Sequence, residues 1–398
     1  MDNNYKYVIV GNGIAGLTAA QEIRKRDEES KILMVTNENY LTYFRVKLSH
    51  NISKSFDVKG LLMYKDQWYE EKRIKVVLNE KVAELNIEQK YIVIKGKKVR
   101  YEKLLLATGA KAFIPPIEGR DKTGVFSLRT ISDLSQIQSY FVNCDNITVI
   151  GGGLLGLEAA WAIKELGKEV NVVQQGPFLL PRQLDEQFAK VVGEMLQDRG
   201  INFYYNAETK EVLGNHKVTG LLFEDGRKLE TGAVLISAGV KPNIELAKSC
   251  NISCNKGIKV DRYLKTSNKE IYAAGDIAEV HGMNLGLWPL AQEQGKIAGA
   301  NMTGANLAYS ISQPSTLLTL GDIKVFSIGN INEFEVSLVS ENKGNYYKLF
   351  LNNFKIVGGI LIGDTTKAVK LKKAVMNKVD VSLLHEKKMS CHEIVETL

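Results

Sequence analysis

The sequence contains few cysteines, and none of them forms a redox pair. Its 398 residues include four cysteines, Cys144, Cys250, Cys254 and Cys391, and no two have the C-x-x-C spacing of a redox dithiol. Cys250 and Cys254, with three residues between them, are a weak candidate for a disulfide or a metal site, but buried or incidental thiols are several times more common. We therefore interpret all four as structural and predict no metal site.

Long apolar runs and blocks of like charge are also missing. No uninterrupted apolar stretch is long enough to span a bilayer, and no charged-then-apolar leader precedes the strand-like residues 5–10. The 52 Lys and Arg residues give a net charge of +7 but are interleaved with 45 Asp and Glu residues, unlike the basic blocks of nucleic-acid-binding proteins. We expect a cytoplasmic protein that binds neither membrane nor nucleic acid, with a modestly basic surface that suits an acidic protein partner.

The sequence does contain one βαβ pattern that occurs twice. In residues 7–35 an apolar strand leads through a glycine-rich turn into a helical segment and a second apolar strand, and residues 147–173 repeat this order. A β meander follows each unit, at residues 82–99 and 212–229. The duplication predicts an α/β protein with two Rossmann-like dinucleotide-binding domains.

A dinucleotide pyrophosphate requires a close approach of the backbone and a helix N-terminus with free N–H groups, and each glycine-rich turn has residues that allow both. Gly11 permits the tight turn, Gly13 lets the backbone approach the phosphate, and Gly16 lets the helix pack on the strand. The second turn has glycine at the same three places. We predict that two dinucleotides are bound by the residues of these turns: Gly11, Gly13, Ile14, Ala15, Gly16, Gly151, Gly153, Leu154, Leu155 and Gly156.

The tail, from about residue 310, has neither a glycine fingerprint nor the βαβ order. It contains a hairpin pattern, in which apolar strands at 346–351 and 354–362 flank Asn352 and Asn353, and then a lysine-rich helical segment at 366–378. We predict a small, separate α+β domain.

In combination, these motifs resemble the two-dinucleotide-binding flavoprotein reductases with glutathione-reductase-like folds, over residues 5–305. In that family the first fingerprint binds FAD and the second binds NAD(P)H. Residues 266–276 are similar to the family's second FAD motif, whose carboxylate, here Asp276, hydrogen-bonds the ribityl chain of the flavin. The resemblance implies a discontinuous FAD-binding domain at 1–113 and 241–309, an NAD(P)H-binding domain at 114–240 and a C-terminal domain at 310–398.

The same resemblance assigns the small residues that connect the two dinucleotide-binding domains. Ala107, Thr108 and Gly109, and also Gly239, match the family's links between domains, where small side chains permit close packing beside the cofactors. Val82, at the start of the first meander, is also a candidate cofactor-binding residue.

The electron acceptor in this family depends on what lies next to the flavin. Disulfide reductases carry a Cys pair after the first βαβ unit and NADH peroxidase-like members carry a single Cys, whereas residues 40–50 here contain none. The pattern of Tyr, Arg and Leu-Ser in this stretch resembles instead that of the NADH:rubredoxin oxidoreductases and of the flavin-binding part of assimilatory nitrite reductases. The resemblance implies that Arg45 and Lys47 lie along the FAD, where positive charge favours the pyrophosphate and the anionic reduced flavin. A solvated basic loop is the alternative.

The starts of two helices are expected near the flavin ring. Glu158 lies in the first turn of the helix after the second fingerprint, where the helix dipole favours a carboxylate. The resemblance implies that it pairs with Lys47 or His50 near flavin N5 and steadies the nicotinamide, which makes Lys47 and Glu158 the catalytic candidates. Trp288 and Pro289 open a helix that in similar enzymes points at the pyrimidine edge of the flavin; an ordinary core aromatic is the alternative for Trp288.

The residues expected at the two riboses leave the coenzyme open. NADH-specific members usually end the second strand of the NAD unit with Glu, whereas this chain has Gln174. Residues 175–178 include no Arg to hold a 2′-phosphate, so we expect NADH, with NADPH as the alternative. In the FAD unit, Thr36 stands where an acid is expected, and Glu38 is close enough in sequence to reach the FAD ribose.

Together these expectations describe a flavin-dependent NADH:rubredoxin (ferredoxin-type) reductase. Its cofactors are FAD and NADH, and electrons pass through the flavin to a small acidic iron-sulfur carrier such as rubredoxin. Two alternatives stay open: an NADH oxidase that uses oxygen directly, and a redox-responsive interaction protein similar to apoptosis-inducing factor. The sequence has no signature of an interface helix, which favours a monomer.

Overall fold

The computed structural model describes residues 3–55, 57–311 and 313–398, which form two compact units. Among the described residues, the first unit comprises 3–47, 57–113 and 239–311, and the second comprises 48–55, 114–238 and 313–398. The short segment 48–55 therefore packs with the second unit although the chain on both sides of it belongs to the first. The three-domain division drawn from the sequence stays a prediction.

The first unit is built on a seven-stranded sheet with a parallel centre, in the order β3-β2-β1-β6-β5-β4, with β18 paired to the end of β6. The strands are β1 (Asn4–Val10), β2 (Ile32–Val35), β3 (Ile74–Val77), β4 (Glu84–Asn86), β5 (Tyr91–Ile94), β6 (Lys97–Leu106) and β18 (Ile271–Ala273). All four residues of β2 and the last four of β1 are buried, because a parallel strand is covered on both faces. Tyr7 and Ile9 of β1 belong to one hydrophobic core, and Val8 and Val10 belong to another.

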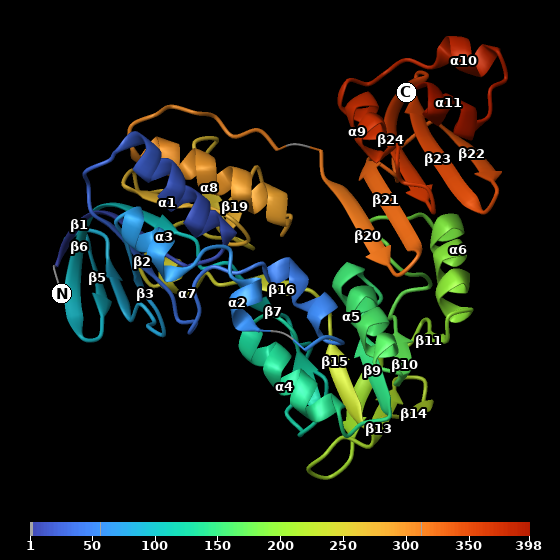
Figure 1. Ribbon diagram of the computed structural model, residues 1–398, viewed down its shortest axis with the longest axis horizontal. Helices are drawn as coiled ribbons and strands as arrows, with labels where there is room; N and C mark the ends of the chain where they lie inside the picture. Colours follow the sequence, from blue (N-terminus) through green and yellow to red (C-terminus); the bar gives the residue numbers. More distant parts are fainter. Residues whose placement is uncertain (1–2, 56, 312) are drawn as a thin grey trace. The chain divides into compact units, whose positions relative to one another are not determined.

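Two helices, α1 (Ile14–Arg26) and α8 (Trp288–Met302), lie side by side in the first of these cores (Figure 1). Glycine allows their close approach, because a Cβ on Gly295 would lie 2.3 Å from the carbonyl oxygen of Ala15 and a Cβ on Gly299 would lie 2.5 Å from that of Ala19. The remaining elements of this unit are η1 (Arg45–Lys47), α2 (Val58–Leu61), α3 (Asp66–Glu71), β7 (Ala110–Ala112), β16 (Val240–Pro242), α7 (Glu245–Lys248), β17 (Ile258–Val260) and β19 (Ala278–Val280).

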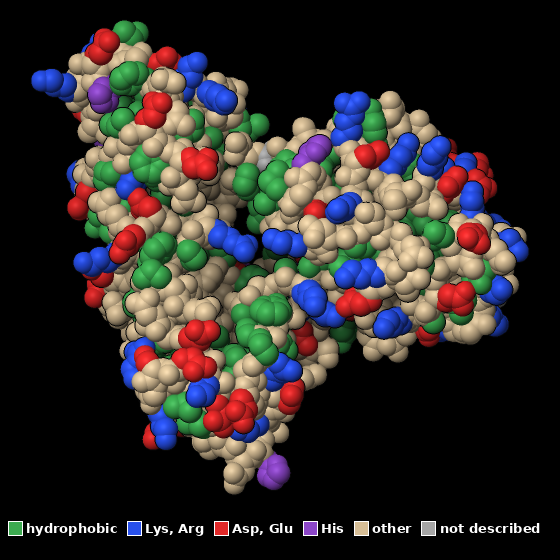
Figure 2. Space-filling model, turned by 180° about the vertical axis from the view of Figure 1, so that it is seen from behind, with side chains coloured by type: hydrophobic (Ala, Val, Ile, Leu, Met, Phe, Trp, Pro, Cys, Tyr) green, Lys and Arg blue, Asp and Glu red, His purple; other side chains and the backbone are tan. Residues whose placement is uncertain are grey.

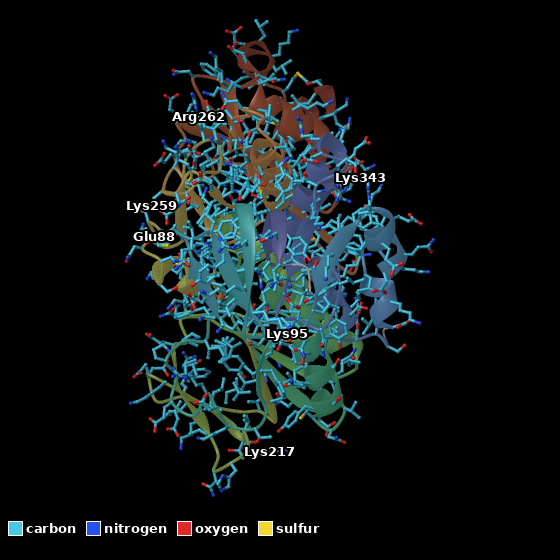
Figure 3. All side chains as sticks on the ribbon, turned by 90° about the vertical axis from the view of Figure 1, so that its left-hand side faces the viewer. Glu88, Lys95, Lys217, Lys259, Arg262 and Lys343 are labelled. Carbon is cyan, nitrogen blue, oxygen red and sulfur yellow. The ribbon has the colours of Figure 1, made fainter. Side chains whose placement is uncertain are left out.

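The second unit repeats the βαβ arrangement in a five-stranded parallel sheet of order β11-β10-β9-β15-β8. Its strands are β8 (Val125–Ser127), β9 (Asn146–Ile150), β10 (Glu169–Val173), β11 (Ile201–Tyr204) and β15 (Ala233–Ile236). The helical elements are η2 (Ser49–Asn51), α4 (Ile131–Phe141), α5 (Leu154–Glu165) and α6 (Glu186–Gln197). A meander of β12 (Thr209–Leu213), β13 (Gly220–Phe223) and β14 (Lys228–Glu230) completes it, with Lys217 in the turn between β12 and β13 (Figure 3).

The tail of the chain forms an antiparallel sheet of order β20-β21-β24-β23-β22, covered by short helices (Figure 1, orange to red). Its elements are β20 (Ser315–Leu320), β21 (Ile323–Gly329), β22 (Val336–Asn342), β23 (Asn345–Asn352), β24 (Lys355–Ile362), α9 (Ala368–Met376), α10 (Ser382–Glu386) and α11 (Cys391–Thr397). The predicted hairpin is confirmed as β23 and β24, and its turn places Asn353 and Phe354 at positive φ. The predicted fold class, two Rossmann-like domains with a small α+β domain, is confirmed.

The structure also describes the cysteines, the length of the helices and the distribution of surface charge. Cys144 and Cys391 are buried, Cys250 and Cys254 are half-buried, and all four are free thiols. In the described ranges, no helix combines the length and the apolar character that crossing a bilayer requires. Figure 2 shows Lys and Arg side chains interspersed with Asp and Glu over the face in view, in agreement with the interleaved charges of the sequence.

Candidate functional site

The first glycine-rich turn forms a cradle at the N-terminus of α1. Gly11 has φ +117°, and a Cβ there would lie 2.0 Å from the carbonyl oxygen of Ala107, so only glycine fits. Gly16 is equally confined, because its Cβ would lie 2.2 Å from the carbonyl oxygen of Gly11. By contrast, a Cβ on Gly13 would meet no described atom within 4 Å, and Gly13 caps α1 without a side-chain hydrogen bond. The open helix N-terminus fits a pyrophosphate.

The residues after β2 form a hydrogen-bonded group centred on Glu38. Tyr43 Oη donates to Glu38 Oε2 and Arg45 Nη2 donates to Glu38 Oε1, both at 2.6 Å. The backbone N–H of Glu38 donates to Thr36 Oγ1 at 3.2 Å. Burial lowers the pKa of the Arg45 guanidinium. The nearby Tyr43, Glu38 and Asp276 raise it by a larger amount, so the net pKa lies above its ordinary value. Arg45 is therefore a cation held in place by Glu38.

Tyr43 is a member of this group that the predicted site residues omit, although it belongs to the Tyr and Arg pattern that carried the resemblance. The other predicted cation, Lys47, is exposed, and its Nζ lies 4.4 Å from the centre of the Phe44 ring. The roles of Glu38, Arg45 and Lys47 toward FAD stay predictions.

The predicted second FAD motif lies beside the first cradle. Gly275 has φ +83°, its N–H donates to Gln294 Oε1 at 2.8 Å, and a Cβ on it would lie 3.0 Å from the Cβ of Ala15. Asp276 is half-buried and lines a pocket with Leu287 and Ala291, at the start of α8. A carboxylate next to the open N-terminus of α1 fits a polar chain that continues from the pyrophosphate.

Helix α8 begins at Trp288, with Pro289 in its first turn and no side-chain cap from Leu287. The Trp288 ring is half-buried and stacks on Phe44, with ring centroids 6.3 Å apart and an interplanar angle of 25°. Trp288 is therefore neither a fully buried core residue nor free in solvent. The structure brings Phe44, which the sequence analysis did not single out, against it.

The predicted links between domains are small and tightly bonded. Thr108 Oγ1 donates to the carbonyl oxygen of Asn243 at 3.1 Å, and Asn243 Nδ2 donates to that of Thr108 at 2.8 Å. Gly109 and Gly239 both have positive φ, at 63° and 101°. Val82, in contrast, is buried and packs in a hydrophobic core of the first unit.

The second glycine-rich turn has the same geometry at the N-terminus of α5. Gly151 has φ +120°, and its Cβ would lie 2.3 Å from the carbonyl oxygen of Ser237; that of Gly156 would lie 1.9 Å from the oxygen of Gly151. A Cβ on Gly153 would meet no atom within 4 Å in the described chain. The fit to a second pyrophosphate is therefore the same as in the first turn.

Side chains around this second turn have specific positions. Gln174 Oε1 accepts a hydrogen bond from the N–H of Gly152 at 2.9 Å, a role that the sequence did not predict. Leu154 is half-buried, and Leu155 is 50% exposed at the open end of α5. An apolar side chain exposed at a helix N-terminus suits a ligand with both a charged and an aromatic part.

Glu158 lies one turn into α5 and meets the segment 48–55. Ser49 Oγ donates to Glu158 Oε2 at 2.6 Å, and His50 Nε2 lies 3.7 Å from Glu158 Oε1. Burial raises the pKa of the Glu158 carboxyl above its ordinary value, and the Ser49 hydrogen bond and the charge of His50 offset part of that rise. Of the two bases considered for Glu158, His50 lies with it in the second unit.

Ser49 is the residue of this group that the predicted site residues omit. Its signal in the sequence was its place in the Leu-Ser pattern of the resemblance, but nothing there indicated a contact with a helix more than 100 residues away. In the described residues no group of three His, Cys, Asp or Glu side chains is placed to hold a metal ion.

Comparison with known proteins accounts for this pair of cradles. The pyridine nucleotide-disulphide oxidoreductase family matches residues 5–295, and the rubredoxin NAD+ reductase C-terminal domain matches residues 314–379. The chain belongs to the pyridine nucleotide-disulphide oxidoreductase family. This family implies binding of FAD and NAD(P)H, and the second match relates the tail of the chain to the C-terminal domain of rubredoxin NAD+ reductases.

Two curated relatives and one solved structure illustrate the similarity. The chain is 35% identical over 382 residues to the NAD(P)H nitrite reductase of Bacillus subtilis, which covers 94% of this chain but only 48% of the relative, so the chain spans about half the length of that protein. It is 33% identical over 373 residues to the NADH-rubredoxin oxidoreductase of Clostridium acetobutylicum, covering 93% of this chain and 94% of the relative. The crystal structure of the Clostridium enzyme covers 99% of this chain and all of its own, with a TM-score of 0.83 at 31% identity.

Proposed function

We propose that this protein takes electrons from NADH through FAD and passes them to a small iron-sulfur carrier, with rubredoxin as the first candidate. The observation that carries the proposal is the absence of cysteine from residues 40–50. The described residues of that stretch place Tyr43 and Arg45 on Glu38, and Ser49 and His50 on Glu158. A carrier that accepts electrons directly needs no thiol relay, which suits this arrangement.

The four cysteines also support a route without thiols. Cys250 Sγ donates to the carbonyl oxygen of Leu85 at 2.9 Å, in the outermost strand of the first sheet, and Cys254 lies in the loop that follows α7. Cys144 follows α4, and Cys391 begins α11 in the C-terminal domain. Burial raises the pKa of the Cys391 thiol to about 12, which disfavours its reactive thiolate.

When bound, FAD supplies the chemistry, because a flavin accepts a hydride and releases electrons one at a time. The chain's own residues bind and orient. The Gly11 cradle and Asp276 hold one dinucleotide, and Arg45, fixed by Glu38, places a positive charge beside it. Trp288 and the uncapped N-terminus of α8 border the same place.

The Gly151 cradle holds the nicotinamide coenzyme in this proposal. Gln174 keeps the turn in shape through Gly152, exposed Leu155 gives the coenzyme an apolar surface, and Glu158, held by Ser49, steadies the nicotinamide. We favour NADH because residues 175–178 offer no arginine to a 2′-phosphate.

An anaerobic panel of acceptors tests the proposal. The purified protein is reduced with NADH or NADPH, and its reoxidation by rubredoxin, a ferredoxin and free disulfides is followed by flavin absorbance. We expect rubredoxin to reoxidise it fastest and disulfides not at all. Oxygen as the fastest acceptor would favour an NADH oxidase, and slow reoxidation by every acceptor with an NADH-dependent change of oligomeric state would favour an interaction module.

The net positive charge of the chain gives a second test of the carrier. Lysines of α9, such as Lys370 and Lys373, are exposed, and the chain carries a net charge of +7. Attraction between exposed charges is screened over about 10 Å at 0.1 M salt, so we expect reduction of an acidic carrier to slow as ionic strength rises. A rate indifferent to salt would exclude electrostatic docking.

A further inference from the structure

The segment 48–55 is fastened to two helices of the second unit. Gln138 of α4 donates through Nε2 to the carbonyl oxygens of Asn51 and Lys54, both at 2.7 Å. Ser49 binds Glu158 near the start of α5, and Ser53 Oγ donates to Glu165 Oε2 at 2.8 Å at the end of the same helix. The segment therefore lies along α5, with a serine bound at each end.

Glu165 connects this segment to a tryptophan. Its second oxygen, Oε1, accepts from Trp161 Nε1 at 3.0 Å, one helical turn earlier. One carboxylate thus binds both the indole of α5 and the hydroxyl of Ser53. Since a carboxylate that accepts two donors loses rotational freedom, Trp161 helps to fix Glu165 for Ser53.

The C-terminal domain holds Trp161 from the other side. Gly321, in the turn between β20 and β21, packs so closely on the indole that a Cβ there would lie 2.3 Å from Trp161 Cζ2. The next residue, Asp322, accepts hydrogen bonds from Arg199 Nε at 3.0 Å and from Arg199 Nη2 at 2.5 Å, which join the turn to the segment that follows α6. Figure 1 shows β20 and α5 adjacent, as their contacts require.

We propose that Ser53 and Trp161 are positioning residues, which keep the segment 48–55 on α5 and so let Ser49 hold Glu158 toward the nicotinamide. The turn at Gly321 seats Trp161, so the C-terminal domain contributes to the orientation of Glu158. The inference rests on the proposed function, in which Glu158 faces the coenzyme. Coupling of this kind is carried by contiguous packed and hydrogen-bonded groups. Here the Gly321 turn packs on Trp161, and hydrogen bonds join Trp161 to Glu165, Glu165 to Ser53 and Ser49 to Glu158.

Four variants test the inference in the full-length, FAD-loaded protein. Trp161→Phe keeps an aromatic ring against Gly321 but removes the N–H donor, and Ser53→Ala removes one hydroxyl from a half-buried residue. The double variant combines them, and Ser139→Ala is the matched control, because Ser139 is exposed on α4 and donates to the carbonyl oxygen of Ser135. Two readouts apply: the limiting rate of flavin reduction by NADH, and hydrogen exchange of residues 48–55 without NADH.

We expect each single variant to slow reduction about threefold to tenfold, the range for one lost hydrogen bond, and to speed exchange of residues 48–55. The double variant should be no slower than the slower single one, because both act through Glu165. In a Glu158→Gln background, Ser53→Ala should change the rate less than about twofold. Unchanged rates, additive losses, or equal slowing in that background would overturn the inference.

A pair of glycine variants tests the part played by the C-terminal domain. Gly321 and Gly344 both lie in hairpin turns of this domain with positive φ, at 60° and 77°, but a Cβ on Gly344 meets no described atom within 4 Å. Lys343, labelled in Figure 3, marks the turn of Gly344. Gly321→Ala should slow reduction like Trp161→Phe, whereas Gly344→Ala should not; equal effects would remove the domain from the inference.

The results separate this inference from the function on which it rests. If NADH does not reduce the wild-type protein, the proposed function is wrong. If NADH reduces it and the Ser53 and Trp161 variants exchange faster at 48–55 without slower reduction, the function stands and the positioning role is wrong.

Discussion

Ser49 and Glu158 lie 109 residues apart in sequence and share a hydrogen bond of 2.6 Å. Ser49 is buried and the Glu158 side chain is 17% exposed, so the hydroxyl is the partner that makes burial of this carboxyl tolerable. The pair joins the segment 48–55 to the helix whose N-terminus carries the second glycine cradle.

Replacing Ser49 should impair reduction by NADH. Ser49→Ala removes a donor that lowers the pKa of Glu158, so we expect the pH profile of the reduction rate to move upward and the rate at neutral pH to fall about threefold to tenfold. Ser49→Thr keeps the hydroxyl and should restore most of the rate. An unshifted profile in Ser49→Ala would show that the hydrogen bond does not control Glu158.

Glu158 also predicts how stability depends on pH. Because its folded-state pKa is raised, chiefly by burial, the protonated carboxyl is favoured, and the stability that this contributes is lost as pH rises through that pKa. The side chain in Glu158→Gln cannot ionise. The melting temperature of this variant minus that of the wild-type protein should therefore increase as pH rises. A gap that narrows with rising pH would mean that the folded protein favours the ionised carboxylate.

Substitutions in the two cradles should abolish the binding of FAD and of NADH independently of each other. Gly11→Ala, with φ +117° and a carbonyl oxygen 2.0 Å from the new Cβ, should lose FAD, whereas Gly151→Ala should keep FAD and lose NADH binding. Gly13→Ala is the sharper test: the described chain leaves room for its Cβ, so the fold should be kept while FAD affinity falls, because the Cβ occupies the approach of the phosphate. Visible absorbance and NADH titration measure the two effects, and full FAD occupancy in Gly13→Ala would contradict the assignment.

Gln174 should tune the choice of coenzyme. Gln174→Glu keeps an acceptor for the N–H of Gly152, adds a charge that favours ribose hydroxyls and repels a 2′-phosphate, and should raise the preference for NADH over NADPH about tenfold. Gln175→Glu, at an exposed neighbouring position, is the control. Comparison of kcat/KM for the two coenzymes measures the preference, and equal changes in both variants would mean that charge alone, not the position of Gln174, matters.

A buried ion pair should be the main polar anchor of the C-terminal domain. Lys348 of β23 is 5% exposed and donates to Asp185 and to Gln187 at the start of α6. Lys348→Ala leaves a partly buried carboxylate without its partner and should cost about 3 kcal/mol of unfolding free energy, whereas Lys370→Ala, at an exposed position of α9, should change it by less than about 0.5 kcal/mol. Urea denaturation followed by tryptophan fluorescence measures both, and equal losses would contradict the anchor.

The local elements could be predicted from the sequence. The first apolar strand, expected from residue 7, is β1 (Asn4–Val10), and the meander expected at 82–99 contains β4 and β5 and the start of β6. Helix α1 begins at Ile14, directly after Gly13, which acts as its N-cap. Such features depend on neighbours in sequence, where periodicity and turn residues are informative.

The contacts between distant segments could not be predicted in the same way. From the sequence, either Lys47 or His50 was a candidate partner for Glu158, and nothing indicated that Gln174 accepts a hydrogen bond from the N–H of Gly152. Ser53, Trp161 and Gly321 belong to no sequence motif. Only the folded chain brings Ser53 and Gly321 to Glu165 and Trp161 of α5. Tertiary packing decides these pairs, and a single sequence holds no periodic signal for it.

Anaerobic titration of the purified protein with NADH counts the electrons that the protein takes up. A flavin with no redox-active thiol beside it takes up two electrons, so we expect a yellow protein that is fully reduced by about one NADH per FAD. A colourless protein that binds no flavin, or an endpoint near two NADH per FAD with a thiol as the second acceptor, would contradict it.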